Sequence, residues 1–196
     1  MESDWEIEID SDASVIDAAW EGYVDLRSDP TRVQEISETA QFPALAEALI
    51  RLNSASSPVW TAKCDVWPVE AFDPDEMDAN PETATAALGC YIDLLPADVQ
   101  TLSTLEAIVE WCTRLCLDLR ARPLRQSRAD AIVRRAFFTP DAVGLGITVY
   151  LTTCAATPPE AAAVLAGALP SLADSVLAAG VKGAEASKYN ESIVGE

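Results

Sequence analysis

Two stretches with the same pattern decide the fold: LGCYIDLL at residues 88–95 and LGITVYLT at residues 145–152. In each stretch large apolar residues alternate with small or polar ones, which is typical of a β-strand with one buried face. The two stretches align at an offset of 57 residues, and the turns before them, at 72–75 and 138–141, align at an offset of 66. The alignment predicts an internal duplication whose first hairpin loop is nine residues longer than the second.

Each repeat also has a preceding strand and a following helix. The preceding strands are expected at Val59–Val69 and Ala129–Phe138, and apolar stripes at helical spacing predict helices over Thr101–Ala121 and Pro158–Ala179. The chain therefore reads as a duplicated β-β-α unit. We expect an α+β fold in which a four-stranded antiparallel sheet carries both helices on one face, a ferredoxin-like arrangement in permuted order.

The residues before this core form a mainly helical extension that contains one short strand. The strand is expected at Trp5–Ile9, a helix at 16–24, a helix start at Asp29-Pro30 and a further helix that ends near Asn53. Residues 23–26 could equally be extended. The domain organisation follows as an acidic extension packed on the core (1–57), the duplicated core (58–180, with units 58–122 and 128–180) and a polar, mobile tail (181–196).

The sheet face turned away from the helices offers the candidate site. Alternation puts polar and aromatic side chains there, and it does not decide between Arg134 and Arg135 on the third strand. The candidate ligand-binding residues are Lys63, Asp65, Trp67, Tyr91, Asp93, Arg135, Thr148 and Tyr150. Such a set could bind a polar ligand, could support acid–base catalysis if burial raised the pKa of Asp93, or could form a paired polar seam against the N-terminal helices. A homodimer through this face is a further alternative.

Composition excludes several classes of function. The chain has 196 residues, a net charge of −19 and no histidine. The charge argues against binding nucleic acid or anionic membranes, and the missing histidine removes Ser-His-Asp and Cys-His catalysis. No apolar stretch predicts a membrane span, and an acidic N-terminus without a signal-peptide pattern predicts a cytoplasmic protein.

The five cysteines are expected to be reduced thiols rather than metal ligands. Cys112 and Cys116 lie four residues apart on the apolar stripe of a helix, and the sequence has no CxxC pair to complete a zinc site. Buried small hydrophobic side chains explain them better. The acidic loop 73–78 lacks the glycine and the closing glutamate of an EF-hand. We expect no cofactor and no metal.

Charge is distributed unevenly along the chain. Residues 114–135 carry seven arginines and two aspartates, whereas every other region is acidic. This basic island is expected to dock the protein's own acids or, alternatively, to bind an anionic ligand. An acidic domain without catalytic equipment suits a non-enzymatic protein that binds or neutralises a basic protein partner. The alternative is a small-molecule-binding or enzymatic domain that uses the open sheet face.

Overall fold

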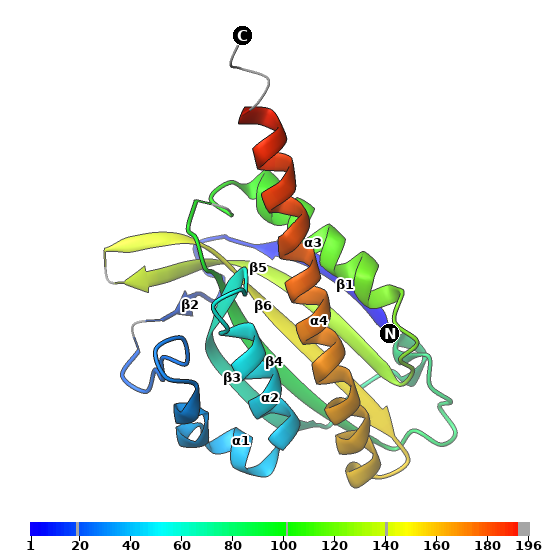
Figure 1. Cartoon of the computed structure of the whole chain (residues 1–196). Helices are drawn as coiled ribbons and strands as arrows, with labels where there is room; N and C mark the ends of the chain where they lie inside the picture. The colour runs from blue at the N-terminus through cyan, green and yellow to red at the C-terminus, as the bar shows by residue number, and fades with distance from the viewer. Residues whose placement is uncertain (19, 101, 140, 192–196) are drawn as a thin grey trace.

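The computed structural model describes residues 1–18, 20–100, 102–139 and 141–191. Pairs of strands are separated by helices along the chain, and the helices cover a mostly antiparallel sheet, as in an α+β protein (Figure 1). The strands are β1 (Glu2–Glu8), β2 (Ile16–Asp17), β3 (Val59–Val69), β4 (Ala86–Pro96), β5 (Ser127–Thr139) and β6 (Ala142–Ala155). The α-helices are α1 (Ser37–Gln41), α2 (Pro43–Leu52), α3 (Leu105–Arg120) and α4 (Pro158–Glu191), and the 3₁₀ helices are η1 (Pro30–Glu35) and η2 (Pro74–Met77).

The sheet has six strands, so the prediction of four was wrong. Five of them follow the order β1-β5-β6-β4-β3, and β2 pairs with β5 beyond the end of β1. The pairs β3–β4, β4–β6 and β5–β6 are antiparallel, whereas β1 and β2 run parallel to β5. The sequence predicted the strand near the N-terminus but not its pairing, because parallel pairing joins segments that lie far apart in the chain.

The helices α2, α3 and α4 cover one face of the sheet (Figure 1). The predicted inward-facing residues of β4 and β6, such as Ile92 and Val149, are buried in one cluster with Leu115 of α3 and Leu169 of α4. Period-two alternation in the strands and period-3.6 stripes in the helices build this core together. The helix α2 packs beside α4 on the same face, so it does not form the polar seam with the second face that was one of the alternatives.

The second face is covered at both ends. At one end Ile16 and Ala18 of the N-terminal segment pack on Trp60 and Leu95. A Cβ atom at Gly146 would lie 2.9 Å from Ile16 Cδ1, so the segment packs closely because Gly146 has no side chain. At the other end the β3–β4 loop carries the buried Met77 and the partly buried Phe72 onto the sheet. The middle of the second face holds the candidate residues.

Most predicted elements are confirmed within a few residues, with two exceptions. Residues 16–18 and 20–24 form β2, turns and irregular backbone instead of a helix, because Ile16 pairs with β5 and is buried against the sheet. Ala19, which was part of the predicted helix, lies outside the described residues. The last helix does not end at Ala179 but continues to Glu191. The predicted mobility of residues 181–196 stays a prediction, and 192–196 lie outside the described residues.

Candidate functional site

Three aromatic rings form the centre of the second sheet face. Tyr91 on β4 pairs directly with Tyr150 on β6, and Trp67 on β3 pairs with Gly89. The ring centroids of the Trp67–Tyr91, Trp67–Tyr150 and Tyr91–Tyr150 pairs lie 6.1, 6.4 and 6.0 Å apart. A Cβ atom at Gly89 would lie 2.7 Å from the Trp67 ring, so this glycine lets the indole lie across the strand. The rings therefore form one half-buried aromatic cluster (Trp67, Tyr91 and Tyr150).

Asp93 is a buried carboxylate beside this cluster. Asp93 is only 7% exposed. Thr148 Oγ1 donates a hydrogen bond to Asp93 Oδ1 at 2.6 Å. Burial raises the pKa of Asp93, although the Thr148 hydrogen bond and the charges of Arg134 and Lys63 oppose that rise. The contact joins β4 to β6 across a directly opposed pair.

The structure brings Arg134, and not Arg135, to this face. Arg134 lies with its guanidinium carbon 5.8 Å from the Tyr150 ring centroid, and its Nη2 donates to Glu8 Oε2 of β1 at 2.9 Å. Arg135 points the other way and donates to the backbone oxygen of Asp10 at 2.9 Å. The alternation along β5 agrees with this placement. Arg134 lies an even number of residues from Arg128 and Asp130 and so faces the same side, whereas Arg135 faces the side of the buried Val133.

The two remaining candidates lie at the β3 side of the cluster. Lys63 Nζ lies 5.1 Å from the Trp20 ring centroid, and Asp65 is exposed. Burial, followed by the charges of Asp93 and Asp65, raises the pKa of Tyr91 to about 12. Of the eight candidate residues, the structure therefore gathers seven around the aromatic cluster, and Arg135 is the one it places elsewhere.

An acidic groove of about 500 Å³ runs beside the cluster over β1, β5 and β6. No local sequence pattern predicts it, because its walls come from β1, from η2 and from the β5–β6 hairpin. Its lining includes four carboxylates, one arginine and one aromatic ring: Asp4, Glu6, Glu76, Asp130, Arg128 and Tyr150. Trp5 borders the groove too, but its side chain packs against the core under the helices. Charged residues at every second position of β1 (Asp4 and Glu6) and of β5 (Arg128 and Asp130) indicate that each strand has one charged face.

A smaller cavity of about 210 Å³ lies along the outer edge of β3. The candidates Lys63 and Tyr91 line it together with Cys64, Trp20 and Glu38. Asp93 lines neither this cavity nor the groove. Its side-chain oxygen accepts the hydrogen bond from Thr148 on the neighbouring strand instead.

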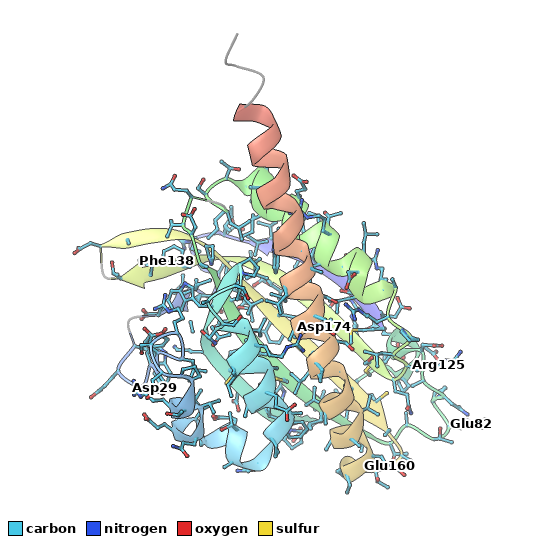
Figure 2. All side chains as sticks on the ribbon, viewed as in Figure 1. Asp29, Glu82, Arg125, Phe138, Glu160 and Asp174 are labelled. Carbon is cyan, nitrogen blue, oxygen red and sulfur yellow. The ribbon has the colours of Figure 1, made fainter. Side chains whose placement is uncertain are left out.

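Six of the seven arginines of the basic island lie within ion-pair distance of acidic residues of the same chain, as predicted, and Arg135 donates to backbone carbonyl groups instead. On the N-terminal side, Arg134 pairs with Glu8, and Arg120 lies 3.9 Å from Asp4. The remaining contacts are Arg114–Glu110, Arg122–Asp118, Arg122–Asp174, Arg125–Asp78, Arg128–Glu76, Arg128–Asp130 and Arg135 with the carbonyls of Asp10 and Ser11. Figure 2 shows Arg125 beside the loop that carries Glu82, where the island holds the β3–β4 loop.

The predicted burial of the helix cysteines is confirmed. Cys112 and Cys116 are 0% and 2% exposed, and burial raises the pKa of Cys112 to about 12. All five thiols are unpaired. Within residues 1–18, 20–100, 102–139 and 141–191, no group of three or more His, Cys, Asp or Glu side chains is arranged to hold a metal ion.

One helix in the described part of the chain, Pro158–Gly180, has the length and composition of a membrane span. Its residues Leu165, Leu169 and Leu172 are buried in the core of the sheet–helix layer. Length and composition alone are weak evidence, since core helices pass the same test.

Comparison with known proteins identifies no relative: no protein-family model, curated protein or solved structure matches the chain.

Proposed function

We propose that the chain is a non-enzymatic, acidic interaction protein that binds a basic segment of a protein partner. The observation that carries this proposal is the internal pairing of the basic island. Because its arginines are engaged with the chain's own groups, they do not form a free anion site, and the net charge of −19 leaves a surplus of acid on the surface. Charge complementarity then favours a basic partner and speeds its association.

The acidic groove is the proposed contact. Four carboxylates line it against the single Arg128. Tyr150 adds a ring face that attracts cationic side chains. The chain itself supports this chemistry, since Arg128 Nε donates to Asp130 Oδ2 at 2.8 Å and the Arg134 guanidinium lies over Tyr150. The proposed site of action is the cytoplasm, where five unpaired thiols stay reduced.

A basic peptide tests the proposal. An eight-residue peptide of alternating lysine and alanine should bind the protein, and the association rate should fall steeply between low salt and 0.5 M NaCl because screening shortens the field. Glu6→Lys in the groove should weaken binding severalfold more than Glu47→Lys, which makes the same charge change on exposed α2. Equal effects of the two variants would show that net charge, and not the groove, determines binding.

A pull-down from the source cell then identifies the natural partner. The captured protein should carry a cluster of Lys and Arg residues, and Glu6→Lys should reduce its recovery. Capture of only acidic or neutral proteins would contradict the proposal.

A small polar ligand is the second candidate, favoured by the cavity at the β3 edge. Lys63, Glu38 and the Tyr91 hydroxyl offer a cation, a carboxylate and a neutral phenol around about 210 Å³. That volume fits a molecule of a few heavy atoms. A thermal-shift screen of small amino acids and carboxylic acids tests it: a stabilising compound should lose its effect in Lys63→Ala and keep it in Glu6→Lys.

We also propose that the core arose by duplication of a β-β-α unit and keeps a permuted ferredoxin-like arrangement, to which β1 and β2 were added. The register supports this proposal, because Ile92 and Val149, which align at the offset of 57, are directly opposed in the β4–β6 pair. An approximate two-fold axis through that pair exchanges the two strands. An experimental structure tests the idea by superposition of residues 58–122 on 128–180.

A further inference from the structure

The two long edge strands in the described part of the sheet, β1 and β3, have outward backbone groups that donate hydrogen bonds to side chains or accept them from side chains. An edge strand normally presents a row of unpaired N–H and C=O groups that can template another strand. In β1, which pairs only with β5, Trp5 N donates to Asp4 Oδ1 at 2.8 Å, and Arg120 Nε donates to the carbonyl oxygen of Ser3 at 2.7 Å. Arg120 also lies 3.9 Å from Asp4, so one aspartate and one arginine cover this stretch of edge together.

The other edge, β3, shows the same arrangement along most of its length. Val66 N donates to Asp65 Oδ1 at 2.7 Å, which repeats the contact between Trp5 and Asp4. Val59 N donates to Ser57 Oγ at 3.3 Å and Thr61 N to Asn53 Oδ1 at 3.1 Å. Pro68, which follows Val66 at the next position of the same parity, has no N–H to offer.

We infer that these contacts close the sheet against strand addition, and that the β1 edge is a latent surface for a second copy of this chain. The inference goes beyond the proposed function, since it concerns the backbone groups at the edges and not the binding of a basic segment, although Asp4 belongs to both the β1 edge and the groove. It also implies that a basic partner contacts a face of the protein rather than extending the sheet. The two edges differ in the number of contacts that occupy their backbone groups. Several separate side chains do so along β3, where Pro68 also lacks an N–H, whereas β1 depends on Asp4 and Arg120.

A second copy is the occupant because every molecule presents the same edge to every other. Antiparallel pairing of two β1 strands would place the half-exposed Ile7 of each copy on a common face, where the alternation of apolar and acidic residues in β1 already separates the two sides. The same pairing would bring Glu6 and Glu8 of two copies together. Their repulsion is a second barrier, and salt screens it over about 3 Å at 1 M.

The test compares the oligomeric state of four forms of the full chain at 0.1 and about 1 M NaCl by sedimentation velocity. Asp4→Ala/Arg120→Ala opens the β1 edge. Asp4→Asn keeps an oxygen that can accept from Trp5 N but loses the charge. Arg32→Ala/Glu35→Ala removes an exposed ion pair on η1, outside the β1 edge that the test concerns. The wild type, Asp4→Asn and the η1 variant should stay monomeric at both salt concentrations, and the edge variant should form dimers at 1 M NaCl.

Amide hydrogen exchange gives a second measurement on the dilute monomers. Exchange at Trp5 should accelerate in Asp4→Ala and stay close to the wild-type rate in Asp4→Asn. An edge variant that is folded and monomeric at every concentration would overturn the inference. Equal dimerisation of the wild type at 1 M NaCl would also overturn it, because charge alone would then guard the edge, and so would an unchanged exchange rate at Trp5 in Asp4→Ala.

Discussion

Replacement of Tyr150 by alanine removes the residue that joins the aromatic cluster to the groove. Its ring contacts Trp67 and Tyr91, with centroids 6.4 and 6.0 Å away, and it faces the guanidinium of Arg134 at 5.8 Å. Each aromatic pair contributes about 0.5–1.5 kcal/mol beyond the burial of its area. The partly exposed cation–π contact adds about 0.5 kcal/mol. We therefore expect Tyr150→Ala to lower the free energy of unfolding by about 2–4 kcal/mol once lost burial is included.

The matched control is Tyr150→Phe, which keeps the ring and both aromatic contacts. Its free energy of unfolding should stay within about 0.5 kcal/mol of the wild type, as for surface changes that break no specific feature. Urea denaturation followed by circular dichroism measures both variants. A double-mutant cycle of Tyr150→Ala with Trp67→Ala should give a coupling of about 0.5–1.5 kcal/mol. A zero coupling, or equal stability of the alanine and phenylalanine variants, would refute the view that the three rings form one stabilising cluster.

Three further predictions concern titration, thiol protection and the N-terminal segment. Burial raises the pKa of Asp93 above its ordinary 3.8, so the folded state holds that proton to higher pH than the unfolded chain does; ionisation then lowers stability as pH rises. Asp93→Asn should accordingly raise the free energy of unfolding at pH 7, with a gain that disappears as pH falls to about 3.8, and a gain independent of pH would contradict the argument. Cys112 and Cys116 should resist a thiol reagent in the native protein and react after denaturation, as absorbance titration would detect, whereas rapid native labelling would count against their burial. Deletion of residues 1–50 should uncover Arg134 and part of the sheet and cause aggregation in light-scattering measurements, and a stable monomeric truncation would rule this out.

The core was predictable because its signals are local and repeated. Alternation at 88–95 and 145–152 fixed which residues of β4 and β6 face the helices, and Ile92 and Val149 are buried there. Helical stripes likewise predicted the burial of Leu115 and Leu169. In each case the hydrophobic pattern repeats several times within one strand or helix, and this repetition decides which side of the element is buried.

The candidate site was only partly predictable because its other parts depend on pairing across the chain. Ile16 had helical spacing with its neighbours, yet its parallel pairing with β5 and its burial determine the structure. The groove needs Glu6 of β1 beside Asp130 of β5 and Glu76 of a loop. No local pattern reports such distant neighbours, although the shared parity of Arg128, Asp130 and Arg134 was a usable sign.

Arg128 already pairs with two of the carboxylates in the groove, so a cation from a partner would have to compete with it. Its guanidinium is held by Asp130 and lies 3.8 Å from Glu76, so the cation that occupies these carboxylates belongs to the protein itself. A lysine or arginine that entered there would exchange with Arg128 instead of filling a vacant place. The displaced arginine would then be free for a carboxylate of the incoming chain. Selectivity would thus favour a segment that carries both charges in register over one that is merely basic.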